Sequence, residues 1–270
     1  MFKKSMWHSI LGIAFPGFIV LAIGFYQALG VTTLSNVQPS AKSVMAATAG
    51  DTTVSPSHPS NSLQVLILGD SIAKGTGDEK SKGFAGYLKD DLKSTTAKEL
   101  EMDDAGIDGL ESKGLLEQLQ DSKLEKLITN SDIILVSIGG NDLKSILTLN
   151  SLAQEDAFNT RLDSYLSNLK QVLGIIGKTN PKAEVVFLGL YNPYAKVTDS
   201  EDAGFLSTWN YKTQQMIEGY GKGIFIPTSD LMQYNLDRYI AKDGLHPNSA
   251  GYQALSNRIS DSIETIVAKL

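Results

Sequence analysis

From Leu63 to the end of the chain, short apolar runs alternate with longer amphipathic stretches. The apolar runs predict strands at Leu63–Leu68, Leu100–Asp103, Ile133–Ile138, Glu184–Leu190 and Ile224–Pro227. Between them, apolar residues recur at helical spacing, most clearly from Phe158 to Ile176 and from Tyr252 to Ile266. Strands separated by helices pair in parallel. The pattern therefore predicts an α/β fold, a three-layer α/β/α sandwich around a five-stranded, mainly parallel sheet, with its ligand site beyond the carboxyl ends of the strands.

The N-terminal part of the chain has a different pattern. An apolar run from Ile10 to Leu29 contains no charged residue, and Lys3 and Lys4 precede it. About 20 such residues are enough to cross a bilayer as a helix. Because the lysines come first, the positive-inside bias places the N-terminus in the cytoplasm and the rest of the chain outside. We interpret residues 1–31 as a cytoplasmic N-terminus with a transmembrane anchor or signal peptide, and expect a single-pass protein of the cell membrane.

Residues 32–62 are rich in Ser, Thr, Ala and Pro and contain almost no large apolar side chain. Such a segment cannot bury enough surface to offset the entropy of ordering, so it is expected to be a flexible linker. The folded domain then spans residues 63–270. The candidate small-x-small cleavage site, Ala47–Ala49, lies far beyond the apolar run, which favours an uncleaved anchor; cleavage would make the domain secreted.

Charge and composition exclude several classes of function. The chain carries a formal net charge of −6 and a pI near 5.1, so it has no basic surface suited to nucleic acid. It contains no cysteine, which excludes disulfides, thiol catalysis and cysteine-bound zinc.

The first candidate for chemistry is Ser71. The strand Leu63–Leu68 runs directly into Gly69-Asp70-Ser71, where a serine at a strand-to-helix turn has an accessible hydroxyl beside a helix N-terminus. That setting suits a nucleophile. The alternative is a helix N-cap, a role that both Ser and Asp favour, and Asp70 is expected to brace the turn.

A second polar segment, Gly139-Gly140-Asn141-Asp142, follows the third predicted strand. Glycines allow close backbone approach, and the Asn141 side chain offers N–H donors to a developing oxyanion at the sheet edge that carries Ser71. A loop with Asx-turn hydrogen bonding is the alternative.

The third segment is Asp243-Gly244-Leu245-His246, just before the last helix. His8 and His58 precede the folded domain, so His246 is its one histidine. A serine hydroxyl needs a base that is neutral near pH 7, and Asp243 is close enough in sequence to orient the imidazole. Taken alone, Asp-x-x-His is also compatible with an ordinary turn aspartate.

These segments, in this order, resemble the conserved blocks of the SGNH/GDSL hydrolase family from Leu63 to about Ile263. The resemblance implies a flavodoxin-like sandwich, an acyl-enzyme mechanism with neither metal nor cofactor, Ser71, Asp243 and His246 as the catalytic residues, and an oxyanion hole formed by Ser71, Gly109 and Asn141. The family's glycine block corresponds to Asp104-Ala105-Gly106-Ile107-Asp108-Gly109, in which Asp104 replaces the usual asparagine. Gly109 is preferred as the oxyanion glycine, with Gly106 as the alternative.

The expected function is that of an extracytoplasmic serine esterase or lipase acting on small-molecule, lipid or glycan esters. Asp70, Tyr191 and Asn192 are candidates for the substrate pocket, because a loop that follows a strand lies at the ligand edge of the sheet. Trp209 and Asn210 are expected in core or lid packing. Two other functions remain open, a carbohydrate or cell-wall O-acetyl esterase on the same fold and a non-catalytic domain that binds wall polymer or lipid.

The predicted topology can be tested on intact cells. Protease added from outside is expected to cut the linker between Thr32 and Ser62 and to release a soluble, active fragment, because the folded domain is expected outside the membrane. Immunoblotting and esterase assays of the supernatant would measure this. Release only after lysis would reverse the predicted orientation.

Overall fold

The computed structural model describes residues 62–93, 96–147, 151–194 and 200–270. They belong to one compact unit, Val54–Leu270. The elements in chain order are β1 (Ser62–Gly69), α2 (Ser71–Lys74), α3 (Gly83–Leu92), β2 (Glu99–Gly106), α4 (Ser112–Gln118), α5 (Ser122–Asn130), β3 (Ile133–Ser137), α6 (Gly140–Leu147), α7 (Ser151–Thr179), β4 (Glu184–Leu188), α8 (Ser200–Gly219), β5 (Gly223–Ile226), α9 (Ser229–Gln233), α10 (Leu236–Tyr239) and α11 (Ser249–Val267).

The strands form one five-stranded sheet in the order β2-β1-β3-β4-β5. Every pairing is parallel, and the register aligns Leu68 of β1 with Ala105 of β2 and Val136 of β3. All five strands therefore end at the same edge of the sheet. The predicted α/β fold with a parallel sheet is confirmed.

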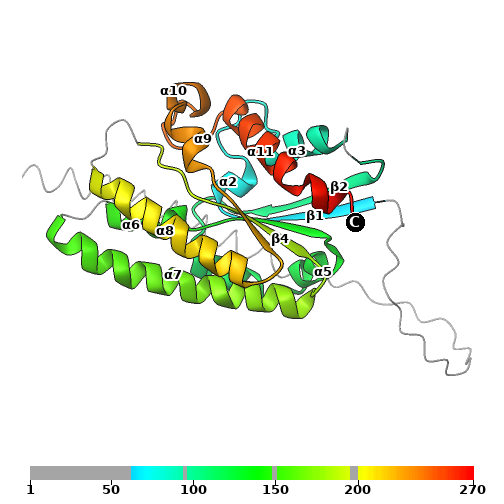
Figure 1. Cartoon of the computed structure of the whole chain (residues 1–270), viewed down its shortest axis with the longest axis horizontal. Coiled ribbons are helices and arrows are strands. Elements are labelled where there is room, and N and C mark those ends of the chain that lie inside the picture. Colours follow the sequence, from blue (N-terminus) through cyan, green and yellow to red (C-terminus); the bar gives the residue numbers. More distant parts are fainter. Residues whose placement is uncertain (1–61, 94–95, 148–150, 195–199) are drawn as a thin grey trace, which may run out of the picture. The chain divides into compact units, whose positions relative to one another are not determined.

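Alternate side chains of each strand pack on opposite faces of the sheet, as the pleat requires. Leu66 and Leu68 of β1 belong to the core with α4 to α8, whereas Val65 and Ile67 belong to the core with α3 and α11. Figure 1 shows α3 and α11 on one face of the sheet and α7 and α8 on the other. The central strands are buried on both faces, which explains why their sequences are continuous apolar runs.

The strand boundaries differ most at β2. The sequence predicts a strand from Leu100 to Asp103, but β2 continues to Gly106 and pairs with β1 along its whole length. Asp103 and Asp104 are exposed, because β2 is an edge strand with one neighbour. Polar residues at an edge are compatible with a strand yet give no apolar signal from which to predict one.

The described residues begin at Ser62. The predicted apolar segment Ile10–Leu29 and all of the predicted linker except its last residue therefore lie outside them; that residue, Ser62, is the first of β1. Within the described ranges, no helix combines the length and the apolar character needed to span a bilayer.

Candidate active site

The turn after β1 places Ser71 at the start of a helix. Gly69 has a φ of +135°, and a Cβ on it would lie 1.9 Å from the carbonyl oxygen of Ser137. The Asp70 N–H donates to that same oxygen at 2.9 Å, and the Asp70 carboxylate accepts from the Ile72 N–H at 3.0 Å. Asp70 is thus the N-cap of α2 and Ser71 its first residue. The capping role belongs to Asp70, which leaves the Ser71 hydroxyl available.

His246 lies on a closed loop between α10 and α11. An antiparallel bridge between Ile240 and Pro247 closes the loop, and the Ala241 N–H donates to the His246 carbonyl oxygen at 2.8 Å. The side chain of Asn248 then caps α11 by accepting from the Gly251 N–H at 3.0 Å. The imidazole is therefore carried by backbone that is fixed on both sides.

The three residues predicted to act together form a continuous hydrogen-bonded chain. Nε2 of His246 lies 2.9 Å from Oγ of Ser71, and Nδ1 lies 2.7 Å from Oδ2 of Asp243. The other carboxylate oxygen of Asp243 accepts from the backbone N–H groups of Leu245 and His246. Partial burial opposes ionisation of Asp243, but the hydrogen bonds from His246 and from the backbone outweigh it and lower the pKa of this carboxyl.

A second set of contacts ties the loop after Ser71 to the start of α11. The buried Asp78 carboxylate accepts from the backbone N–H groups of Lys80, Lys82 and Gly83 and from the hydroxyl of Ser249 at 2.5 Å. The Glu79 carboxylate accepts from the Ser249 N–H at 2.9 Å. Because Ser249 is three residues after His246, these bonds fix the distance between the two loops. The sequence pattern did not indicate this contact.

Asn141 and Asp142 hold the loop after β2. The Asn141 amide donates to the carbonyl oxygen of Leu110 at 2.9 Å. The buried Asp142 carboxylate accepts from the N–H and the hydroxyl of Ser112 at 2.9 and 2.6 Å. Two consecutive residues in the first turn of α6 therefore fix the segment that follows Gly109.

The two candidate oxyanion glycines have different environments. Gly106 donates its N–H to the Asp104 side chain at 2.8 Å, and a Cβ on it would lie 2.4 Å from the backbone nitrogen of Lys74. Its role is close packing of β2 against α2. Gly109 has a φ of +74° and no heavy atom within 4 Å of where its Cβ would be, so it borders open space. Of the two, Gly109 has the accessible backbone.

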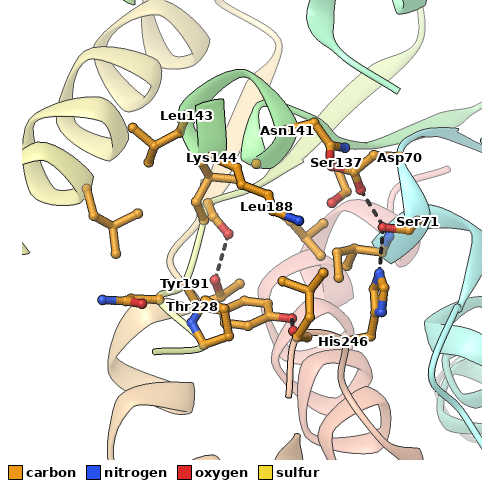
Figure 2. Close-up of a pocket in the computed structure, with 18 of the residues that line it drawn as sticks. Asp70, Ser71, Ser137, Asn141, Leu143, Lys144, Leu188, Tyr191, Thr228 and His246 are labelled. Atoms are coloured by element: carbon orange, nitrogen blue, oxygen red, sulfur yellow. Dashed lines mark hydrogen bonds between the residues drawn. The ribbon is translucent and has the colours of Figure 1, made fainter. Parts of the chain in front are cut away.

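A pocket of about 960 Å³, part of it open to solvent, adjoins Ser71 and His246. It is lined by Asn141 and by the three residues predicted for it, Asp70, Tyr191 and Asn192. Figure 2 shows Ser71, Asn141, Tyr191 and His246 around this pocket. The walls are mostly apolar and include residues that sequence analysis did not single out: Ile72, Leu143, Leu188, Leu190, Leu206, Leu245 and Leu255.

Hydrogen bonds to two other parts of the chain hold the loop after β4, which lines the pocket. The Tyr191 hydroxyl donates to the Leu245 carbonyl oxygen at 2.8 Å, next to His246. The Asn210 side chain bonds both the N–H and the carbonyl oxygen of Leu190, each at 2.8 Å. Trp209 is fully buried, and its ring lies 4.4 Å from that of Tyr165. Trp209 is thus a core residue, whereas Asn210 positions the pocket loop.

Asp70 combines burial with a position at the pocket. Its side chain is almost fully buried, and burial raises the pKa of the carboxyl to about 7, with a further contribution from the nearby charge of Asp142. Hydrogen bonds from the backbone of Ile72 act in the opposite direction and are outweighed. Among the residues described by the structure, no three His, Asp or Glu side chains are grouped so as to hold a metal ion.

A parallel α/β sandwich with a serine hydroxyl and an imidazole beside an apolar pocket at the carboxyl edge of its sheet defines the class of ester hydrolases. Within that class, the model of the GDSL-like lipase/acylhydrolase family matches residues 67–254, and the chain belongs to this family. It is therefore a carboxylic ester hydrolase, as the sequence predicts.

Individual proteins resemble the chain in sequence or in fold. The chain is 28% identical to the uncharacterized protein YpmR of Bacillus subtilis over 75% of its own length and 82% of that protein. It is 25% identical to the spore germination lipase LipC of Bacillus licheniformis, over 73% of this chain and 94% of that one. The lipase Lip_vut3 from a goat rumen metagenome shares the fold, with a TM-score of 0.69 and 24% identity over 74% of this chain and 97% of that chain.

Asp70→Asn is expected to change how stability depends on pH. The pKa of Asp70 rises from 3.8 to about 7 on folding, so the folded chain retains a proton that the unfolded chain releases. The contribution of Asp70 to the free energy of unfolding is fully present below about pH 4. It is lost as the pH rises to about 7, by roughly 1.4 kcal/mol per pH unit. The asparagine side chain keeps an oxygen that can cap α2. Because it does not ionise, the variant should not lose stability at this position as the pH rises. Urea unfolding should show the variant gaining about 2 kcal/mol on the wild type between pH 5 and pH 7. Parallel pH profiles would contradict the raised pKa.

Proposed function

We propose that the chain is a serine esterase in which Ser71 is the nucleophile, His246 the general base and Asp243 the group that orients the base. The observation that carries the proposal is the chain of hydrogen bonds from Asp243 through His246 to Ser71. With Nδ1–H donating to Asp243, Nε2 has the lone pair that accepts the serine proton as Oγ attacks the ester carbonyl.

The remaining steps follow from this arrangement. The imidazolium formed in the first step is stabilised by the Asp243 carboxylate and returns its proton to the leaving alcohol, which gives an acyl-Ser71 intermediate. Water then repeats the sequence, with His246 as base, and releases the acid. Asp243 stays ionised throughout, in keeping with the hydrogen bonds that lower its pKa.

The proposed oxyanion hole consists of the backbone N–H groups of Ser71 and Gly109 and the side-chain amide of Asn141. Asn141 lines the pocket, and its amide already donates one hydrogen to Leu110, which orients the second. The open space beside Gly109 favours it over Gly106. Removal of one such donor typically costs about 10²- to 10³-fold in rate.

The pocket supports acyl esters as substrates. Aliphatic side chains such as Leu188, Leu206 and Leu255 line it, and they offer contacts to a hydrocarbon chain rather than hydrogen bonds to a sugar. A non-catalytic binding domain would have no need for the aligned Asp243, His246 and Ser71. We therefore favour an esterase or lipase over a glycan esterase or a binding module.

We also propose that the enzyme acts outside the cytoplasm. The basis is the sequence pattern of Lys3 and Lys4 before an uncharged apolar run, followed by the Ser/Thr/Pro/Ala-rich residues 32–62. Residues 63–270 would form the hydrolase domain, held at the membrane by residues 1–31 or secreted after their removal.

Ser71→Ala is expected to lower ester hydrolysis by at least about 10³-fold and to leave the fold intact, because the hydroxyl is partly exposed. The assay is hydrolysis of p-nitrophenyl esters from acetate to palmitate, with circular dichroism as the check on folding. A fluorophosphonate probe should label the wild type and spare the variant. Ser164→Ala, an exposed serine on α7, is the matched control and should retain activity and labelling. Residual turnover of more than a few per cent in Ser71→Ala would assign the nucleophile elsewhere.

Asp243→Asn is expected to lower kcat/KM by up to about 10⁴-fold, since an amide can hold the imidazole in the wrong tautomer and cannot stabilise the imidazolium. Unfolding by urea should change much less, because the Asp243 side chain is 44% exposed. The measurement is kcat/KM against pH for the wild type and the variant. If both the rate and the pH profile stayed unchanged, the orienting group would have to be something other than Asp243.

A further inference from the structure

Lys144 is the one cation that lines the pocket, among the residues that the structure describes. It lies on α6 three residues after Asn141, and residues at this spacing share one face of a helix. Figure 2 shows its side chain extending from α6 into the pocket, toward the side on which Ser71 lies. The helix that presents Asn141 to the ester therefore presents an ammonium group to the same space.

The surroundings of Lys144 do not neutralise its charge. No carboxylate of the described residues lies within ion-pair distance of its ammonium group, although six other Lys and Arg side chains of the described residues have such partners. Two other pocket-wall groups that can carry a charge near neutral pH are engaged elsewhere: Asp70 caps α2, and His246 bonds Ser71 and Asp243. The remaining wall is largely aliphatic.

The acyl-transfer steps do not need Lys144. Ser71, His246 and Asp243 handle the proton, and N–H donors stabilise the oxyanion. An ammonium group beside aliphatic walls gives nothing to a neutral ester with a hydrocarbon acyl chain, and it loses hydration when such a substrate fills the pocket. An anionic group on the substrate would replace that hydration with a charge-assisted hydrogen bond.

We propose that Lys144 makes the enzyme selective for esters that carry an anionic group, a phosphate or a carboxylate, within reach of its ammonium group. This inference rests on the proposed function of Ser71 and His246, because it concerns the substrate of that same site. Lysine binds both kinds of anion as a compact point charge. Because the chain carries a net charge of −6, its overall charge does not attract anions, and Lys144 supplies a local positive charge at the pocket.

Two matched pairs of substrates test whether the anionic group lies in the alcohol part or in the acyl part of the ester. The first pair has the same acyl chain on glycerol 3-phosphate and on glycerol, so the charge is in the alcohol. The second pair is a p-nitrophenyl hemiester of a dicarboxylic acid and the p-nitrophenyl alkanoate of equal chain length, so the charge is in the acyl group. For each pair, the readout is the ratio of kcat/KM for the anionic ester to that for the neutral ester.

The full chain and its Lys144→Gln, Lys144→Glu and Lys126→Gln variants are compared. Lys126 is exposed on α5, outside the pocket, and its substitution changes the net charge equally. In at least one pair, Lys144→Gln should lower the ratio by about 10-fold, and Lys144→Glu should lower it further. Lys126→Gln should leave it unchanged. Raising the salt concentration should lower the wild-type ratio and have little effect on that of Lys144→Gln.

The two proposals fail in different ways. If the wild type hydrolyses the esters but the ratio is the same in wild type and Lys144→Gln for both pairs, selectivity by Lys144 is overturned and the serine esterase proposal stands. An equal fall of the ratio in Lys126→Gln would likewise overturn it, because the effect would come from net charge. Absence of hydrolysis of all four esters by the wild type would instead count against the proposed function.

Discussion

The contact between the carboxyl ends of β1 and β3 is the constraint on which the site depends. A side chain at Gly69 would overlap the Ser137 carbonyl oxygen, which lies 1.9 Å from where its Cβ would be, and the next residue donates its N–H to that oxygen. This close approach ends β1 and turns the chain into α2, so that Ser71 faces the pocket. The segment after β3 begins at the same place and brings Asn141 to it. One backbone contact in the middle of the sheet thus positions both the proposed nucleophile and the proposed oxyanion donor.

The same junction buries two carboxyl groups close together. Asp70 caps α2, and Asp142 holds Ser112 and with it the loop that follows Gly109. Burial is the main reason that the pKa of Asp70 is raised to about 7, and the charge of Asp142 adds to it. Each carboxyl accepts a hydrogen bond from a backbone N–H group, Asp70 from Ile72 and Asp142 from Ser112. The hydrogen bonds that assemble the pocket therefore require two carboxyl groups to be buried near each other. The electrostatic free-energy cost of this burial grows as Asp70 ionises.

Much of the site could be predicted because its polar residues directly follow buried strands, where apolar runs give a strong signal. Ser71 and Asn141 were identified in this way, and His246 was identified as the one histidine of the predicted domain, close in sequence to Asp243. The structure brings Ser71, Asn141 and His246 to one pocket. The aliphatic walls could not be predicted, since Leu206 and Leu255 are indistinguishable in sequence from the core residues of α8 and α11. Asp78 was also missed, because its partner Ser249 is 171 residues away. Lys144 could have been found from its helical spacing to Asn141.

The loop closed by Ile240 and Pro247 carries both the imidazole and the carboxylate that orients it. The pocket walls come from other parts of the chain, chiefly the loop after β4 together with α6 and α8. The proposed proton handling and the recognition of substrate therefore come largely from different parts of the chain, which meet at Ser71 and at Leu245, where the Tyr191 hydroxyl donates to the carbonyl oxygen. Substitutions in the walls can accumulate during evolution while the loop from residue 240 to residue 247 is left untouched. This division gives the scaffold a route to new ester substrates through changes in one part of the chain at a time.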